Sequence, residues 1–259
     1  MFDLLAHHRA DLRERAIRWC ENRPGDAART LPVSEQFGPT IQGEGPHTGR
    51  SVQFLRLGGC NLSCTWCDTP YTWDSTRFDL RVELTPTTAE QIVDDLIADV
   101  PLVISGGEPL MHQASPAFAY VLHGAVARGC EVHVETNGTI APTEQTANLV
   151  DHFSVSPKMG HAGDHKGRDA RLHDGWLPHL ESGRACLKYV VRDPADVHVV
   201  ADDTADLGVP RRAVWVMPLG TSTEELQGRW PGVARAAADR HINASHRTHV
   251  LAWGDRKGT

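Results

Sequence analysis

The sequence lacks the features that mark several specialised classes of protein. Aromatic residues make up only 6% of its 259 residues, whereas hydrophobic residues make up 40% and charged residues 23%, which is ordinary globular composition. No apolar run approaches the ~18 residues of a membrane-spanning helix. The first residues also lack the basic and apolar regions of a secretory signal. We therefore expect a cytoplasmic protein with no membrane partner.

An excess of positive charge is also missing. The chain has 26 Lys and Arg against 33 Asp and Glu, so its net charge is −7. This balance argues against a broad polyanion-binding surface and predicts no nucleic-acid partner, although it allows a local basic pocket. The length is sufficient to bury a core without disulfides or structural metals.

The sequence pattern divides the chain into two parts. Residues 1–31 contain six arginines, and a set of apolar residues at helical spacing predicts a helix that ends at 22–26. This set is Leu5, Leu12, Ala16 and Trp19. We interpret residues 1–31 as an appended, helical segment and 32–259 as the main domain.

In the main domain, short apolar runs alternate with helical patterns. Strands are predicted at 52–57, 102–104, 132–134, 153–155, 187–191, 214–217 and 248–252. Helices are predicted over 86–100 and in a second segment that Ser115 caps and Gly129 ends, while Pro231 is expected to break a later helix. This alternation favours an α/β fold with a parallel sheet or partial barrel.

Polar strings follow several of these strands directly. They occupy 105–109, 135–138, 156–158 and 217–220. Because the carboxyl ends of parallel strands form the ligand-binding rim of a sheet or barrel, we expect the four strings to surround one mouth.

The strongest motif is a cluster of cysteines with the spacing Cys-x3-Cys-x2-Cys. It consists of Cys60, Cys64 and Cys67. Thiolates suit zinc and iron–sulfur clusters. A structural zinc site needs four ligands, and His47 and His112 stay open as a fourth. A 4Fe–4S cluster held by three thiolates would leave one iron open for an exogenous ligand, which is typical of a catalytic site.

This triplet resembles the signature of the radical S-adenosylmethionine (SAM) superfamily. In that superfamily the open iron binds the amino and carboxylate groups of SAM, and one electron cleaves SAM to a 5′-deoxyadenosyl radical. The string Gly106-Gly107-Glu108-Pro109 resembles the second motif of the superfamily, whose backbone receives the methionine amino group. A zinc site or simple buried thiols are the alternative interpretation.

Further strings resemble the 7-carboxy-7-deazaguanine synthase family. They are QFGPTIQGEG at 36–45, GRSV at 49–52, RLGGC at 56–60, CDT at 67–69, ETNG at 135–138 and SPK at 156–158. The resemblance covers roughly residues 33–252. It implies that 32–259 is a radical SAM catalytic domain with a modified, incomplete (β/α) barrel, and that the protein forms a homodimer.

The resemblance also implies a reaction. The substrate would be 6-carboxy-5,6,7,8-tetrahydropterin, whose ring contracts with loss of ammonia to give 7-carboxy-7-deazaguanine, a lyase reaction of 7-deazapurine (queuosine-type) biosynthesis. SAM would be regenerated. The implied cofactors are a 4Fe–4S cluster, SAM and Mg2+, and the implied partner is a reduced flavodoxin- or ferredoxin-like electron donor.

The resemblance assigns roles to individual residues. The cluster ligands are Cys60, Cys64 and Cys67. The SAM contacts are Trp66, Cys67, Asp68, Gly107, Ser156, Pro157, Lys158, Met217, Pro218, Leu219 and Gly220. The substrate contacts are Ile41, Gln42, Gly43, Arg56 and Ser105. Thr69 would offer its hydroxyl to Mg2+, a hard ion that suits a neutral oxygen.

Several of these roles have simpler alternatives. Arg56, a natural fork for a carboxylate, could be a solvated residue of a half-exposed strand. Asp68 could orient the cysteine loop, Trp66 could only cover the cluster, and Glu44 could cap a turn. Glu108 is expected to fix the Gly-Gly backbone. The other cysteines are expected to be ordinary small buried residues: Cys20, Cys130 and Cys186.

Two other functions stay open at this point. A radical SAM activating enzyme would explain the cysteines and the Gly-Gly-Glu-Pro string, but not the QGEG string or Thr69. A sensor that holds zinc or a cluster would not cleave SAM at all. The histidines at 161, 165 and 173 lack metal-ligand spacing and predict a loop, which could close over the site as a lid.

Overall fold

An open, curved sheet forms the centre of the protein. A computed structural model describes residues 2–259, with side chains described from residue 9 onward. Its sheet contains β1 (Thr30–Ile41), β2 (Ser51–Leu57), β3 (Thr85–Thr88), β4 (Leu102–Gly106), β5 (Val132–Thr136), β6 (His152–Val155), β7 (Ala185–Val191), β8 (Val214–Pro218) and β9 (Asn243–Ala244). The strand order is β3-β1-β2-β4-β5-β6-β7-β8-β9.

The sheet is parallel from β2 to β9, whereas β1 is antiparallel to both of its neighbours. β3 and β9 lie at opposite edges of the linear strand order, so the sheet is an incomplete barrel. This confirms the fold class that the alternating pattern and the resemblance predict.

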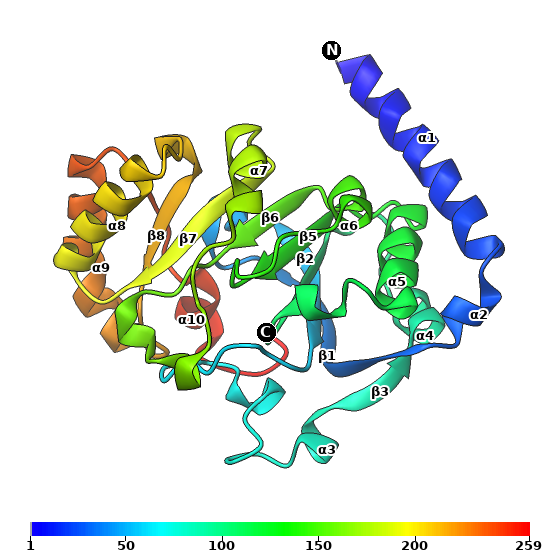
Figure 1. Cartoon of the computed structure of the whole chain (residues 1–259), viewed down its shortest axis with the longest axis horizontal. Coiled ribbons are helices and arrows are strands. Elements are labelled where there is room, and N and C mark those ends of the chain that lie inside the picture. Colours follow the sequence, from blue (N-terminus) through cyan, green and yellow to red (C-terminus); the bar gives the residue numbers. More distant parts are fainter. Residues whose placement is uncertain (1) are drawn as a thin grey trace.

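Helices flank the sheet toward both of its ends. They are α1 (Phe2–Glu21), α2 (Pro24–Ala27), α3 (Leu80–Glu83), α4 (Ala89–Asp94), α5 (Pro116–Ala127), α6 (Glu144–Leu149), α7 (Leu177–Glu181), α8 (Pro194–Asp206), α9 (Thr223–Asp239) and α10 (Thr248–Trp253). Figure 1 shows α4 and α5 toward one end of the curved sheet, α8 and α9 toward the other, and the C-terminus near the middle.

Most of the predicted elements are confirmed. Six predicted strands lie within β2, β4, β5, β6, β7 and β8. The second predicted helix is α5, whose first turn is capped because the Ser115 hydroxyl accepts a hydrogen bond from the Ala117 N–H at 3.3 Å. Gly129 follows α5 at a φ of +82°, a conformation that favours glycine at a helix end.

The helix predicted at 86–100 is wrong at both ends. Residues 86–88 belong to β3, because Pro86 pairs with Pro32 of β1. The Thr88 side chain accepts a hydrogen bond from the Gln91 N–H and caps the helix, so α4 begins at Ala89. It ends at Asp94, and beyond it the Gln53 side chain binds the backbone of residues 97 and 100 in place of helical hydrogen bonds.

Two other predictions are corrected. The strand expected at 248–252 is α10, because the Thr248 N–H binds the Gly43 carbonyl at 3.0 Å instead of a neighbouring strand. A short apolar run has no periodicity that separates a strand from a buried helix. Pro231 lies inside α9, which continues to Asp239 because Leu226 and Val233 bury the helix on both sides of it.

Alternation along the strands separates an apolar face from a polar one. Leu55, Ile104 and Phe153 belong to the main core beneath the helices. Residues one position later point to the opposite, inner face. There the strands end in polar side chains that line one cavity: Arg56, Ser105, Glu135, Ser154 and Lys188.

The N-terminal helix packs on the outside of α5. Ala16 is 1% exposed, Trp19 stacks on His123 at 4.0 Å between ring centroids, and the Arg13 Nε donates to the Ala127 carbonyl at 2.9 Å. The predicted contribution of Leu5 lies outside the described side chains. Thr30 and Leu31 already belong to β1 and pair with β3.

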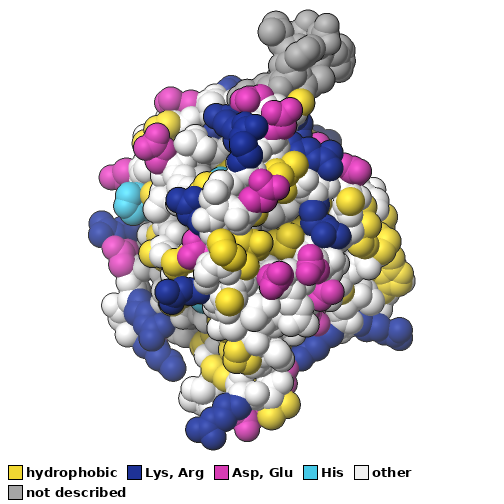
Figure 2. Space-filling model, turned by 90° about the vertical axis from the view of Figure 1, so that its right-hand side faces the viewer, with side chains coloured by type: hydrophobic (Ala, Val, Ile, Leu, Met, Phe, Trp, Pro, Cys, Tyr) yellow, Lys and Arg dark blue, Asp and Glu magenta, His cyan; other side chains and the backbone are white. Residues whose placement is uncertain are grey.

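The face drawn in Figure 2 carries charges of both signs. Figure 2 shows acidic and basic side chains interspersed on the face at the right-hand side of Figure 1. Among residues 2–259, no helix has both the length and the apolar character that crossing a bilayer requires.

The packing of α4 on α5 gives a stability prediction with a matched control. A Cβ on Gly124 of α5 would lie 2.4 Å from a methyl carbon of Val93, so Gly124→Ala is expected to overpack the interface and lower the free energy of unfolding by about 1–3 kcal/mol. A Cβ on Gly228 of α9 would meet no atom within 4 Å. Because glycine is unfavourable inside a helix, Gly228→Ala should raise the free energy of unfolding by about 0.5–1 kcal/mol. Urea unfolding of the two variants measures both effects, and stabilisation by both would contradict the assigned packing.

Candidate active site

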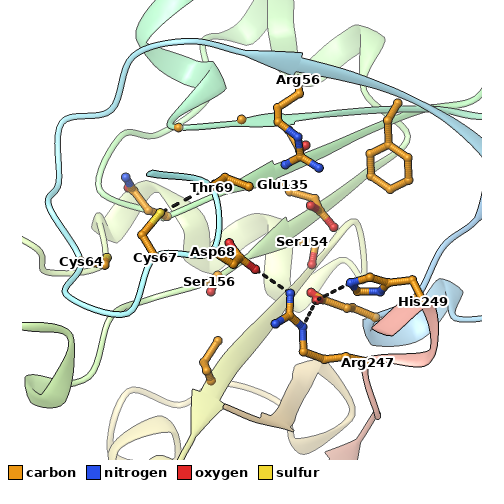
Figure 3. A pocket seen from close by; sticks show the side chains of 18 of the residues that line it. Arg56, Cys64, Cys67, Asp68, Thr69, Glu135, Ser154, Ser156, Arg247 and His249 are labelled. Carbon is orange, nitrogen blue, oxygen red and sulfur yellow. Dashed lines mark hydrogen bonds and ion pairs between the residues drawn. The ribbon is translucent and has the colours of Figure 1, made fainter. Parts of the chain in front are cut away.

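A cavity opens at the carboxyl ends of the parallel strands. Its volume is about 290 Å3, and its lining comes from β1, β2, the cysteine loop, β4 to β8 and the C-terminal segment (Figure 3). This is the rim at which the polar strings were expected to meet. Segments more than 200 residues apart in the sequence therefore face one another here, such as Gln42 and His249.

Most of the predicted site residues line this cavity. They are Ile41, Gln42, Gly43, Arg56, Cys60, Cys64, Trp66, Cys67, Asp68, Thr69, Ser105, Gly107, Ser156, Lys158 and Met217. Four predicted SAM contacts lie outside the lining: Pro157, Pro218, Leu219 and Gly220. Leu219 is nevertheless fixed nearby, because its N–H donates to the Val191 carbonyl at 2.8 Å.

The cysteine loop is held directly against the Gly-Gly-Glu-Pro string. The Gly107 N–H donates to the Leu57 carbonyl at 3.1 Å, and the Glu108 N–H donates to the Gly59 carbonyl at 2.8 Å. A Cβ on Gly107 would lie 2.0 Å from the Gly59 oxygen and 2.9 Å from the Cys60 Cβ. Glycine is therefore required at 107, because any side chain would push the two motifs apart.

The three sulfur atoms lie in surroundings suited to thiolate ligands. The Cys60 sulfur accepts a hydrogen bond from the Leu62 N–H at 3.4 Å, and the Cys67 sulfur accepts one from the Trp73 indole at 3.3 Å. Burial raises the pKa of Cys60 to about 12 and raises that of Cys64. These groups stay protonated at neutral pH unless a metal replaces the proton. The donor set thus fits an iron–sulfur cluster.

A closed zinc site does not fit this arrangement. The His112 Nε2 contacts the Gly58 carbonyl at 2.8 Å, and the His47 ring packs on His133 and His152 at 4.4 and 4.6 Å between centroids. Within the described part of the chain, no group of three or more His, Cys, Asp or Glu residues is placed to hold a single metal ion. Of the remaining cysteines, Cys130 and Cys186 are buried, as expected, and Cys20 is half-buried.

Glu108 has a structural position next to the cavity. It is fully buried, and its carboxylate accepts hydrogen bonds from the N–H groups of Leu110 and Asn137 and from the Thr136 hydroxyl, at 2.7–2.9 Å. Burial raises the pKa of Glu108 above the ordinary value, although these hydrogen bonds act to lower it. The side chain thus ties the 135–138 string to β4, and does not hold the Gly-Gly backbone through its carboxylate.

Arg56 is oriented from behind by an acidic partner. Its Nε donates to the Glu35 carboxylate at 2.7 Å, and the Tyr71 hydroxyl donates to the same oxygen at 3.1 Å. The Arg56 side chain is only 19% exposed, which does not fit a solvated strand residue. Figure 3 shows its guanidinium group pointing into the cavity toward Glu135. The two terminal nitrogens are therefore presented to a ligand.

A network of buried charges forms the opposite wall. Glu44 accepts hydrogen bonds from Lys188 and from the Arg247 Nε, the latter at 2.8 Å. Burial would raise the pKa of Glu44, but the positive charges of Lys188 and Arg247 outweigh burial and hold it well below its ordinary value. Glu44 thus stays charged, and its carboxylate takes part in this network and not in a turn cap.

Asp68 joins this network from the cysteine loop. Its carboxylate accepts a hydrogen bond from the Arg247 Nη2 at 2.5 Å (Figure 3). Burial would raise the pKa of Asp68, and Arg247 lowers it below the ordinary value. Asp68 also lines the cavity, so its hydrogen bond with Arg247 does not prevent the predicted contact with SAM.

Trp66 is fixed by residues of the histidine-containing loop. Its indole N–H donates to the His161 Nδ1 at 3.0 Å, and the other His161 nitrogen lies 3.5 Å from the Asp196 carboxylate. The His165 ring accepts a hydrogen bond from the Ser63 N–H at 3.3 Å. The predicted loop at 161–173 therefore packs against the cysteine loop in this structure.

Sequence reasoning missed part of the lining, for two different reasons. Ser154 and Lys188 alternate with apolar strand residues near the rim, so strand periodicity could have placed them on the inner face. Glu135 belongs to the 135–138 string that was expected at the mouth, but no role was assigned to it. Arg247 and His249 follow β9, a strand of only two residues that the sequence did not predict, and they belong to no recognised motif. Only the return of the C-terminal segment to the cavity brings them there, together with residues 255–257 and 259.

The depressed pKa of Glu44 predicts how stability depends on pH. Glu44→Gln leaves Lys188 and Arg247 buried without their shared counter-ion, so it should lower the free energy of unfolding at pH 7 by about 3 kcal/mol. In the wild type this contribution is present above the ordinary pKa of 4.5 and is lost as the pH falls below it. Urea unfolding between pH 7 and 3 should show that the difference between variant and wild type shrinks on acidification.

The matched control for this experiment is Glu224→Gln. Glu224 is exposed in the first turn of α9, so its substitution should change stability by about 0.5 kcal/mol or less. A Glu44→Gln variant as stable as this control at pH 7 would contradict the buried network.

Comparison with known proteins identifies the family. The model of the Radical SAM superfamily matches residues 55–162. The chain is 34% identical to a 7-carboxy-7-deazaguanine synthase of Pyrobaculum aerophilum, over 90% of this chain and 99% of that protein, and 36% identical to one of Hyperthermus butylicus, over 85% and 92%. The crystal structure of QueE from Escherichia coli matches with a TM-score of 0.60 and 25% identity, over 84% of this chain and 93% of that one. The chain therefore belongs to the 7-carboxy-7-deazaguanine synthase family of the radical SAM superfamily.

Proposed function

We propose that this protein is a 7-carboxy-7-deazaguanine synthase that converts 6-carboxy-5,6,7,8-tetrahydropterin into 7-carboxy-7-deazaguanine with loss of ammonia. The observation that carries the proposal is the single cavity in which three cysteines face a rim of polar groups suited to a carboxylated pterin. Its relatives of that name match the chain over most of its length. The activating-enzyme alternative needs a protein substrate, whereas the relatives that match most of the chain are named 7-carboxy-7-deazaguanine synthase.

The cofactor end of the cavity is formed by the cysteine loop. Cys60, Cys64 and Cys67 would hold the 4Fe–4S cluster, which supplies, when bound, the electron that cleaves SAM to a 5′-deoxyadenosyl radical. Gly107 lines the cavity beside this loop, where the SAM methionine would bind. Lys158 donates to the Ser156 hydroxyl at 3.0 Å and lies 5.5 Å from the Trp66 ring, so it offers a positive charge to the SAM carboxylate.

The substrate end is formed by the inner face of the sheet. Arg56 would bind the substrate carboxylate with its two terminal nitrogens. The Gln42 amide donates to Glu135 at 3.3 Å, and together they present donors and acceptors to a pterin edge. The Ser105 hydroxyl is buried and has no hydrogen-bond partner among the residues of the described chain. A substrate polar group would recover the free energy of that unmade bond.

Further parts of the proposal rest on the resemblance. Thr69 would bind Mg2+, since its hydroxyl lies at the cavity and has the Cys67 sulfur, at 3.7 Å, as a weak partner. The remaining predicted SAM contacts, Pro157 and residues 217–220, would act through their backbone near the rim. The appended segment 1–31, the homodimer, the flavodoxin- or ferredoxin-like donor and the cytoplasmic location stay predictions.

An anaerobic turnover assay tests the proposed reaction. The reconstituted protein with reductant, SAM, Mg2+ and 6-carboxytetrahydropterin should form 7-carboxy-7-deazaguanine without net loss of SAM, as measured by mass spectrometry. Cys60→Ala, Cys64→Ala and Cys67→Ala should each abolish product and the cluster absorbance, because no nearby thiolate replaces the lost ligand. Cys20→Ala, on α1, is the control and should retain activity.

The outcomes of this assay separate the alternatives. 5′-Deoxyadenosine without product from a protein with an intact cluster would favour the activating enzyme, and neither product would favour a sensor. In the same assay Thr69→Ala should weaken the dependence on Mg2+ while SAM cleavage stays possible, and an unchanged response to Mg2+ would remove Thr69 from the site.

Arg56→Ala should chiefly raise the Michaelis constant for the pterin substrate. Loss of a charge-assisted hydrogen bond costs about 1.5–3 kcal/mol, which corresponds to a rise of roughly ten- to a hundredfold. Arg50→Ala is the matched control, because Arg50 pairs with Glu131 at 2.8 Å and lies outside the cavity lining. Equal Michaelis constants for the two variants would remove Arg56 from the substrate site.

A further inference from the structure

One buried guanidinium group joins three segments of the site. The Arg247 side chain is 7% exposed. Its Nε donates to Glu44 at 2.8 Å, its Nη1 donates to the Gly220 carbonyl at 2.6 Å, and its Nη2 donates to Asp68 at 2.5 Å. Each nitrogen of the group therefore makes one hydrogen bond to the protein, which uses three of its five N–H donors. These three bonds fix the position of the guanidinium group relative to Glu44, Asp68 and Gly220.

Each acceptor comes from a segment with a different proposed role. Glu44 directly follows the substrate contacts 41–43, and its N–H donates to the Gln42 side chain at 3.2 Å. Asp68 lies between the cluster ligand Cys67 and the proposed Mg2+ ligand. Gly220 ends the proposed SAM turn at 217–220. Arg247 thus connects the substrate, cluster and SAM segments, which the chain otherwise joins only through long connections.

The segment that carries Arg247 is itself bound to the substrate loop. The Gly45 N–H donates to the Ser245 hydroxyl at 2.9 Å, and the Thr248 N–H donates to the Gly43 carbonyl at 3.0 Å. A Cβ on Gly43 would lie 1.8 Å from a ring nitrogen of His249. Because the two segments are this closely packed, a displacement of the guanidinium group would also displace the loop that holds Gln42.

The shape of the guanidinium group suits this role better than any other cation. Its planar fork presents donors in three fixed directions, whereas a lysine ammonium is a single point of charge on a flexible chain. Lys188, the other buried cation of the network, binds Glu44 but not Asp68 or Gly220. A lysine at 247 would preserve the charge without preserving the three simultaneous contacts.

We propose that Arg247 is a positioning residue that holds the substrate loop, the cluster loop and the SAM turn in one arrangement, and so couples SAM cleavage to turnover of correctly placed substrate. This inference rests on the proposed function. A displacement of about 1 Å between reacting groups can reduce turnover about a hundredfold, so a loosened arrangement should still cleave SAM while converting little substrate.

The test compares Arg247→Lys and Arg247→Gln with a matched control, Arg184→Gln. Arg184 is half-buried and, like Arg247, donates to backbone carbonyls, those of Ala147 and Val150, but it lies outside the cavity lining. The ratio of 5′-deoxyadenosine to 7-carboxy-7-deazaguanine should rise about tenfold or more in both Arg247 variants, because charge-assisted bonds are lost. kcat should fall more than the Michaelis constant for the pterin rises, with only partial rescue by lysine.

A second measurement does not depend on activity. Hydrogen–deuterium exchange should accelerate in peptides covering 42–49 and 64–70 of both Arg247 variants, and should stay unchanged there in Arg184→Gln. If Arg247→Gln does not fold, as judged by circular dichroism, the same measurements are made on Arg247→Lys and Asp68→Asn and compared with Arg184→Gln. Exchange and product ratios equal to those of Arg184→Gln would overturn the positioning role.

The failure of the proposed function gives a different result. A wild-type protein that forms no 7-carboxy-7-deazaguanine would refute that function whatever the variants do. The exchange data would still decide whether Arg247 holds the substrate loop and the cluster loop in place.

Discussion

The site depends on the pairing of charges that the incomplete barrel buries on its inner face. Charged groups lose hydration there, and each is tolerated only beside an opposite charge or a set of hydrogen-bond donors. Glu44 lies between Lys188 and Arg247, and Arg247 reaches Asp68. Glu35 supports Arg56 in the same manner. Because the pairings fix the direction of each side chain, they also determine which polar atoms stay available for ligands.

The two sides of the sheet follow different physical rules. On the outer side, Leu55, Ile104 and Phe153 pack against helices, and volume and shape decide what fits. On the inner side, the strands present Arg56, Ser105, Glu135, Ser154 and Lys188, and hydrogen bonding decides what fits. Alternation along each strand permits both, so the strands supply stability and ligand contacts at once.

The cofactor end relies on close backbone contact more than on charge. Gly107 approaches Gly59 so closely that a single added carbon would separate the two motifs. Glu108, one residue later, is fully buried and ties the segment after β4 to the 135–138 string, because its carboxylate accepts hydrogen bonds from Thr136 and Asn137. The cysteine loop is therefore positioned by backbone and buried hydrogen bonds, which keeps the cavity side of the loop open for ligands.

Local sequence determined the cysteine triplet, the Gly-Gly-Glu-Pro string, six strands and the capped helix α5, because spacing, alternation and capping act over a few residues. Their common rim followed, since parallel strands bring their carboxyl ends together. The short run at 248–252 and the helix at 86–100 escaped prediction, because Gly43, Gln53 and β1 satisfy their backbone from far along the chain. Only the tertiary structure placed Arg247 and His249 at the cavity. Arg247 pairs with Glu44, about 200 residues earlier in the chain, and no local sequence pattern encodes a contact over that separation.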